Sequence, residues 1–109
     1  MKKTNFLKIL RQDNRQFAVI GLGRFGRSVC ETLHQSGHEV LGVDQDEKLV
    51  AEALAAKVVS NAIALDSTDV NALKEAGIFE FETVIVAIGN YLKESIVTSL
   101  NLKEGGVKY

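Results

Sequence analysis

The stretch QFAVIGLGRFGRSVCETLHQSGHEVLGVD, residues 16–44, decides the fold of this chain. An apolar run leads into Gly21, Gly23 and Gly26, a helical pattern follows, and a second apolar run ends on Asp44. This is the G-x-G-x-x-G pattern between a strand and a helix, where it predicts a phosphate-binding turn. The first glycine permits a sharp turn, the second lets pyrophosphate approach the backbone, and the third lets the helix pack on the sheet. The N–H groups and positive dipole end of the helix then face the phosphates.

Strands and helices are expected to alternate along the rest of the chain. We predict strands over residues 16–21, 39–44, 62–65 and 83–88, and helices over residues 24–35, 46–56, 68–76 and 92–103. This alternation predicts an α/β, Rossmann-like doubly wound parallel sheet with strand order 3-2-1-4-5, in a single domain. Residues 107–109 would open the fifth strand. Because such a sheet usually has about five or six strands, we expect the natural protein to continue beyond Tyr109; the alternative is that a partner supplies this strand.

Apolar spacing predicts which helix faces are buried. The helix over 24–35 would bury a row of residues four apart, namely Phe25, Val29 and Leu33. The helix over 92–103 would turn four apolar residues toward the sheet: Leu92, Ile96, Val97 and Leu100. The helix over 68–76 would have Ser67 or Thr68 as its N-cap. Gly37 suits a left-handed C-cap for the first helix, and acidic residues would cap the helix over 46–56.

Bulk composition describes an ordinary soluble globular protein. The chain has 109 residues, 46% of them hydrophobic and 25% charged, with a formal net charge of −1. One domain is expected, and the charge balance argues against a nucleic-acid partner. The single cysteine, Cys30, cannot form an internal disulfide, which suits a reducing cytosol. No apolar run approaches the roughly 18 residues of a membrane span, so we expect a cytoplasmic protein.

Residues 1–15 differ from the rest because they carry five basic side chains against one acid. We interpret them as a basic N-terminal leader ahead of a domain over residues 16–109. The alternative is a short basic helix that docks on a partner or near acidic lipid. Seven or eight helical residues are too few to be stable alone, so the alternative requires a partner.

Four loops should meet in one crevice, because the carboxyl ends of parallel strands lie at the same edge of a sheet. Asp44 could accept both hydroxyls of an adenosine ribose, with Gln45 beside it, or could simply cap the next helix. Its carboxylate would repel a 2′-phosphate, which disfavours NADP. Arg24 could fold over the phosphates or remain a solvated surface charge.

The other two loops carry the remaining candidate residues. Asp66, Ser67 and Thr68 could close over the adenine edge or cap the following helix. After the fourth strand, Ala87, Ile88 and Gly89 leave room for a ligand, and Asn90 could bond phosphate or the second ribose, or cap a helix. No catalytic triad, metal cluster or acid–base pair is visible. We expect His34 and His38 at the surface, and Cys30 to serve packing.

Three segments together resemble the nucleotide-binding lobe of RCK domains, also called KTN domains. They are residues 17–50, LDSTDVNALKEAGI and FETVIVAIGN, and the GLGRFG loop is rather specific to the regulatory subunits of Ktr- and Trk-type bacterial potassium-uptake systems. The resemblance implies binding of ATP, ADP, NAD or NADH without turnover, which the sequence cannot rank. It also implies dimers that form an octameric ring, docked on the cytosolic face of a membrane potassium channel or transporter.

The resemblance also implies roles for individual positions. The loop of Gly21, Leu22, Gly23, Arg24, Phe25 and Gly26 would hold phosphates, Asp44 the ribose, and residues 66–68 the adenine, with residues 87–90 as the opposite wall. One departure is that the family's third strand usually ends in a Gly-Asp-Ala-Thr-like motif, whereas this chain reads ALDST. The alternatives are the cofactor domain of an NAD-dependent oxidoreductase and a methyltransferase that binds S-adenosylmethionine.

Overall fold

The computed structural model describes residues 15–88 and 92–107. The basic leader predicted for residues 1–15 lies outside this part except for Arg15. Gly89, Asn90 and the last two residues of the predicted fifth strand also lie outside it. Their predicted roles stay predictions.

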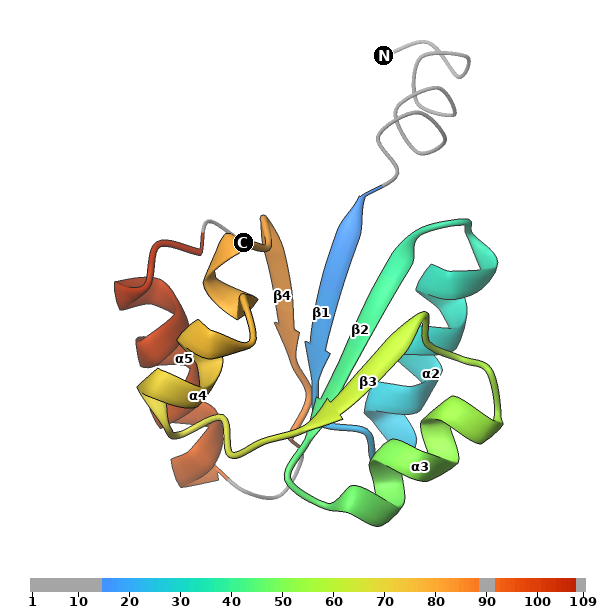
Figure 1. Cartoon of the computed structure of the whole chain (residues 1–109), viewed down its shortest axis with the longest axis horizontal. Coiled ribbons are helices and arrows are strands. Elements are labelled where there is room, and N and C mark those ends of the chain that lie inside the picture. The colour runs from blue at the N-terminus through green and yellow to red at the C-terminus, as the bar shows by residue number, and fades with distance from the viewer. Residues whose placement is uncertain (1–14, 89–91, 108–109) are drawn as a thin grey trace, which may run out of the picture.

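A parallel sheet with strand order β3-β2-β1-β4 forms the centre of the molecule (Figure 1). Its strands are β1 (Gln16–Ile20), β2 (Glu39–Asp44), β3 (Asn61–Ala64) and β4 (Thr83–Val86). The helices of the described residues between these strands are α2 (Arg24–Gln35), α3 (Glu47–Ala55), α4 (Val70–Glu75) and the 3-10 helix η1 (Ile78–Glu80), and α5 (Leu92–Glu104) follows β4. The Rossmann-like fold and the order of the first four strands are thus as predicted, whereas η1 was not foreseen.

Helices cover both faces of the sheet, with α2 and α3 on one side and α4 and α5 on the other (Figure 1). Each side has its own apolar core. The α2–α3 side buries a cluster that includes Val19, Leu22 and Val40. The opposite side buries a cluster that includes Ala18, Leu73 and Ile78. Neighbouring residues of β1 therefore point to opposite cores, as expected for a strand buried on both faces.

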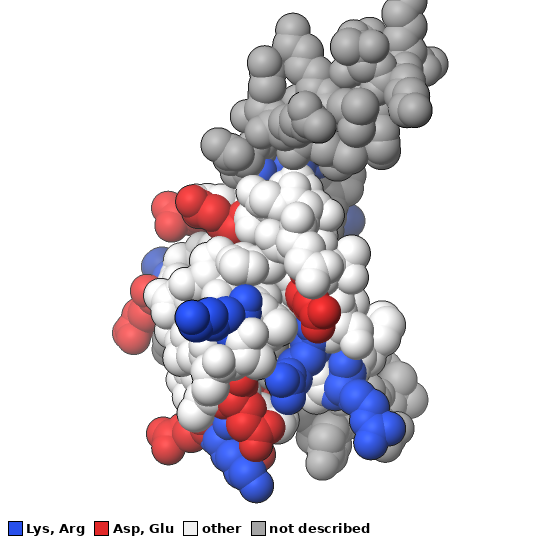
Figure 2. Space-filling model, turned by 90° about the vertical axis from the view of Figure 1, so that its right-hand side faces the viewer, with Lys and Arg blue, Asp and Glu red and all other residues white. Residues whose placement is uncertain are grey.

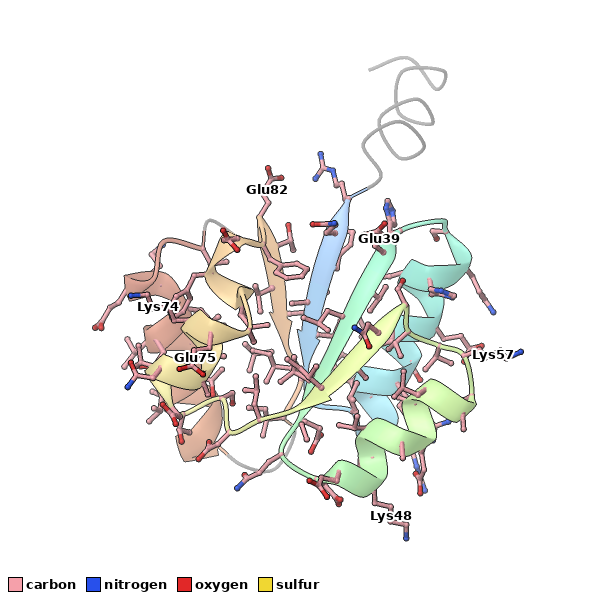
Figure 3. All side chains as sticks on the ribbon, viewed as in Figure 1. Glu39, Lys48, Lys57, Lys74, Glu75 and Glu82 are labelled. Atoms are coloured by element: carbon pink, nitrogen blue, oxygen red, sulfur yellow. The ribbon has the colours of Figure 1, made fainter. Side chains whose placement is uncertain are left out.

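Charged side chains lie outside these cores. In Figure 3, Lys48 and Lys57 point outward from the α3 side, and Lys74 and Glu75 from α4. Glu82 lies at the amino end of β4, where its Oε1 is 3.8 Å from Nη1 of Arg15 (Figure 3). Figure 2 shows that basic and acidic side chains are interspersed on the face it views. That face offers no uniformly basic surface to a nucleic acid.

The predicted buried rows of two helices are wrong in part. On α2, Val29 and Leu33 are half-buried and pack against the α2–α3 core, as predicted. Phe25 is 68% exposed, and the fully buried residues of α2 are Gly26 and Cys30. On α5, Ile96 and Leu100 are 52% and 56% exposed. Val97 is half-buried, and the side chain of Leu92 lies outside the described part. The inward face of α5 instead carries Thr98 and Leu102, because the Thr98 hydroxyl has a buried hydrogen-bond partner that apolar spacing cannot reveal.

Two further predictions need correction. The N-cap of α4 is Asp69, whose carboxylate accepts hydrogen bonds from the N–H groups of Asn71 and Ala72, so α4 begins after the predicted cap residues. His38 is buried, not at the surface, because its ring packs edge-on against Phe17 with centroids 5.1 Å apart. Gly37 does adopt the predicted left-handed conformation, with φ of 88°.

Candidate functional site

A cleft of about 690 Å³ opens at the carboxyl edge of the sheet, the lower edge in Figure 1. Eleven of the residues predicted for the site line it: Gly21, Gly23, Arg24, Phe25, Asp44, Gln45, Asp66, Ser67, Thr68, Ala87 and Ile88. All four predicted loops therefore meet in one cavity. Its volume falls in the range of small-molecule and cofactor sites, about 300–1,000 Å³.

Backbone contacts that exclude side chains shape the glycine loop. Gly21 has φ of 109°, its N–H donates to Val43 O at 2.7 Å, and an added Cβ would overlap the carbonyl oxygen of Ala87. At Gly26 an added Cβ would overlap the carbonyl oxygen of Gly21, so α2 lies directly against the turn. At Gly23, by contrast, nothing lies within 4 Å of an added Cβ. The first and third glycines are thus needed for the fold, and the second faces open space in the cleft.

Two predicted loop residues do not line the cleft. Leu22 is fully buried and packs in the α2–α3 core. Its contribution to the site is its backbone N–H, which donates to Oδ2 of Asp44 at 2.8 Å. Gly26 acts only through its close packing beneath the turn.

The first turn of α2 carries neither a side-chain cap nor an acidic residue of its own. The N-cap residue of this helix is Gly23, which provides no side-chain hydrogen bond. The first N–H groups of a helix have no intrahelical partners and carry partial positive charge. This end of α2 is therefore suited to an anion.

Asp44 is held in place by two backbone donors. Its Oδ2 accepts the N–H of Leu22 and its Oδ1 accepts the N–H of Asp46, each at 2.8 Å. It is not the N-cap of α3, because Asp46 has that role and accepts the N–H of Lys48 at 2.9 Å. A carboxylate offers about four lone-pair positions, so about two remain for a ligand. The acidic capping of α3 is confirmed.

The rim of the cleft carries exposed side chains. Arg24, Phe25 and Gln45 are exposed and contribute to the lining. Arg27, one turn into α2, instead forms an ion pair with Glu52 of α3, with Nη1 3.9 Å from Oε1. Arg24 thus supplies basic charge on the glycine-loop side of the cleft.

The loop after β3 forms a compact turn around Asp66. Its Oδ1 accepts the N–H and the hydroxyl of Thr68 at 2.9 and 2.6 Å. These hydrogen bonds lower the pKa of the Asp66 carboxyl, with the Thr68 hydroxyl as the largest cause. Ser67 points into the interior, where its hydroxyl lies 2.6 Å from the hydroxyl of Thr98. The predicted capping of α4 by Ser67 or Thr68 is replaced by this inward hydrogen bond and the turn at Asp66.

The end of β4 provides the opposite wall. The N–H of Ala87 donates to Ile20 O at 2.7 Å, and both Ala87 and Ile88 line the cleft. The backbone carbonyl of Ala87 lies against Gly21, and its small side chain would lie 3.6 Å from a Cβ added at Gly26. A small residue is expected here, where the chain needs room beside the glycine loop.

Sequence reasoning missed four lining residues, Ile20, Asp46, Leu49 and Leu65. Three of them are apolar. Ile20 and Leu65 adjoin predicted site residues and could have been found by extending each strand-end by one position. Leu49 lies on α3, and only the packing of α3 beside the cleft reveals it.

The described residues provide neither a metal-binding group nor a membrane-spanning helix. Across residues 15–88 and 92–107, His, Cys, Asp and Glu side chains do not gather into a group of three or more that could hold a metal ion. No helix in these two segments is both long enough and apolar enough to cross a membrane. Cys30 is buried, and burial raises the pKa of its thiol to about 11.

The parallel sheet, the glycine turn and the acid at the end of β2 define a Rossmann-like fold of the nucleotide-binding type. Residues 17–108 match the TrkA-N domain family. The chain therefore belongs to the TrkA-N family, the nucleotide-binding lobe of RCK (KTN) domains.

Several relatives of the chain are named as potassium-uptake proteins. The chain is 52% identical over 93 residues to "Ktr system potassium uptake protein C" of Bacillus subtilis (strain 168), covering 85% of this chain and 41% of that protein. It is 43% identical over 99 residues to "Ktr system potassium uptake protein A" of Vibrio alginolyticus, covering 91% and 44%. The chain thus spans less than half the length of these relatives.

Solved structures share the fold at low sequence identity. Synechocystis arogenate dehydrogenase matches with a TM-score of 0.63 at 20% identity, over 83% of this chain and 28% of that chain. A short-chain dehydrogenase/reductase from Brucella melitensis matches with a TM-score of 0.63 at 22% identity, over 85% and 48%. At such identities the likeness shows the fold alone.

Proposed function

We propose that this chain is the nucleotide-sensing regulatory domain of a potassium-uptake system. It binds an adenine nucleotide, ATP/ADP or NAD/NADH, in the cleft without transforming it. The observation that carries the proposal is the pairing of an open glycine turn at the α2 N-terminus with the fixed carboxylate of Asp44. Membership of the TrkA-N family and relatives named as potassium-uptake proteins support the regulatory role.

The residues of the cleft fit the diphosphate group of an adenine nucleotide. Open space at Gly23 and the uncapped start of α2 suit the phosphates. Arg24 at the rim adds a guanidinium whose geometry matches phosphate. The phosphates would therefore lie over the turn between β1 and α2.

Asp44 fits the ribose. Its lone pairs not used by Leu22 and Asp46 can accept the 2′- and 3′-hydroxyls, and Gln45 adjoins it at the rim. A 2′-phosphate would place a second anion against this carboxylate, so we expect NADP to bind far more weakly than NAD. The apolar side chains of Leu49 and Leu65, with the loop of residues 66–68, provide a wall for the adenine.

The partner in this proposal is a membrane potassium channel or transporter subunit, with the chain on its cytoplasmic side. We propose that the domain works as a homo-oligomer, a dimer or an octameric ring of dimers. Exposed apolar side chains support a contact with another protein, because Ile96 and Leu100 lie one helical turn apart on the outward face of α5.

Calorimetric titration of the purified chain with ATP, ADP, NAD, NADH, NADP and S-adenosylmethionine tests the proposal. We expect the first four ligands to bind and to be recovered unchanged after incubation. S-adenosylmethionine should not bind. Binding of S-adenosylmethionine alone would replace the sensor with a methyltransferase, and no binding of any adenine nucleotide would refute the proposal.

A further inference from the structure

The loop after β3 is tied to α5, none of whose described side chains lines the cleft. The hydroxyls of Ser67 and Thr98 lie 2.6 Å apart, although the residues are 31 positions apart in the chain. Ser67 is 8% exposed and Thr98 is 0% exposed. Ser67 lines the cleft, whereas Thr98 on α5 does not. A hydrogen bond in the low-dielectric interior is stronger than one in water, so this pair holds the loop against α5.

A second side chain of α5 contacts the same loop. Nδ2 of Asn101 lies 3.3 Å from Thr68 O and 3.5 Å from Ser67 O. Asn101 follows Thr98 by three residues, so both lie on one face of the helix. Together Ser67, Thr98 and Asn101 form what we call the loop–α5 contact, which holds both the side chain and the backbone of the cleft wall.

The other end of this loop is tied to the backbone of Asp44, whose carboxylate is the proposed ribose ligand. The N–H of Leu65 donates to the backbone oxygen of Asp44 at 3.1 Å. The Asp44 side chain in turn accepts the N–H of Leu22 in the glycine loop. Hydrogen bonds thus run from the glycine loop through Asp44 and residues 65–68 to Thr98 and Asn101.

We propose that Thr98 and Asn101 are positioning residues for the nucleotide cleft. They hold residues 66–68 in the orientation that closes over the adenosine half of the ligand. The inference rests on the proposed function, because it assigns a role in nucleotide binding. By linkage, a ligand that needs this orientation stabilises the loop–α5 contact in return, so its presence is transmitted to α5.

A purely structural role makes a different prediction. If the hydroxyl pair only satisfies buried polar groups, its loss lowers stability and leaves the affinity of the folded protein unchanged. ADP would then change hydrogen exchange at the end of α5 by the same amount in the variant as in wild type.

The test compares Thr98→Val, Asn101→Ala and Thr98→Ser with wild type, using ADP as the probe. Thr32→Val is the control, because the Thr32 hydroxyl bonds only within α2, to Ser28 O at 3.0 Å, and lies outside the cleft. Affinity is measured by calorimetry at a temperature where each variant is folded by circular dichroism. Hydrogen exchange of residues 98–104 is measured with and without saturating ADP.

We expect Thr98→Val and Asn101→Ala each to bind ADP about tenfold more weakly. Both should lose the ADP-induced protection of residues 98–104. Thr98→Ser keeps the hydroxyl and should retain wild-type affinity, as should Thr32→Val. If Thr98→Val does not fold, the half-buried Asn101→Ala variant decides the outcome. Unchanged affinity and protection in these variants, with ADP binding to wild type, would overturn the inference. Failure of wild type to bind ADP would instead refute the proposed function.

Discussion

Removal of the Asp44 carboxylate should weaken every ribose-bearing ligand by about the strength of one charged hydrogen bond. Two backbone N–H groups at 2.8 Å occupy two of its lone pairs, and about two remain for the ribose hydroxyls. One hydrogen bond to a charged group contributes about 1.5–3 kcal/mol. We therefore expect Asp44→Ala to bind ADP about 10- to 150-fold more weakly than wild type.

The assay is a double-mutant cycle in which loss of the ligand's 2′-hydroxyl takes the place of the second mutation. Calorimetry measures the affinity of wild type and Asp44→Ala for ADP and for 2′-deoxy-ADP. Wild type should prefer ADP, because only ADP offers the 2′-hydroxyl to the carboxylate. Asp44→Ala should bind the two ligands about equally. The coupling between the carboxylate and the hydroxyl is then separated from any general effect of the substitution.

A stability control is needed because Asp44 also holds Leu22 and Asp46 in place. Asp69→Ala provides it, since this carboxylate caps α4 with hydrogen bonds at 3.0 and 3.3 Å and does not line the cleft. Loss of such a cap costs about 1 kcal/mol of stability, and the affinity for ADP should remain that of wild type. If wild type binds ADP and 2′-deoxy-ADP equally, the assignment of Asp44 to the ribose is wrong.

Three further predictions concern the turn, the cysteine and pH. Gly26→Ala should fail to fold or lose several kcal/mol of stability in urea unfolding, because its Cβ would overlap the Gly21 carbonyl. Gly23→Ala, whose Cβ meets open space, should keep wild-type stability but lose nucleotide affinity. Equal stability of the two variants would contradict this prediction. Burial raises the pKa of the Cys30 thiol to about 11. A colorimetric thiol reagent at neutral pH should therefore label Cys30 only after unfolding. Labelling of the native protein as fast as of the unfolded protein would show that the thiol is accessible. Folding lowers the pKa of Asp66, so this carboxylate contributes stability above its unfolded pKa of about 3.9, and the contribution is lost as pH falls through the folded pKa. The difference in stability between wild type and Asp66→Asn, measured by urea unfolding, should be largest near neutral pH. It should shrink as the pH falls below the unfolded pKa, and a difference that stays constant into acid would exclude this cause.

Sequence predicted the sheet and the turn well because local chemistry dictates both. Only glycine tolerates the left-handed φ at Gly21 and the close carbonyl at Gly26, so spacing alone fixed the shape of the loop. The end of β2 likewise placed Asp44 at the cleft, since parallel strands end at one edge. These features depend on neighbours in the chain or on a general rule of topology.

The errors arise where tertiary packing decides. Apolar spacing predicted that Ile96 and Leu100 face the sheet. In the structure α5 is oriented so that Thr98 faces inward instead, where its hydroxyl lies beside that of Ser67, 31 residues away in the chain. His38 is a polar residue between a turn and β2, yet it is buried and its ring packs edge-on against Phe17. The lining residue Leu49 depends in the same way on how α3 packs beside the strand ends. No pattern along the chain reports these contacts.

The rigid and adjustable parts of the cleft indicate how a sensor of this kind would distinguish its ligands. The glycine loop is fixed by two acceptors: Val43 O accepts the N–H of Gly21, and the Asp44 carboxylate accepts the N–H of Leu22. A ligand cannot reshape it cheaply, so all adenine nucleotides would meet the same turn. Differences between them must be read by the exposed side chains at the rim, Arg24 and Gln45, and by the loop held on α5. A response to phosphate number therefore requires differential contacts at the rim or at α5, and the outward apolar face of α5 is the surface where such a change would reach another protein.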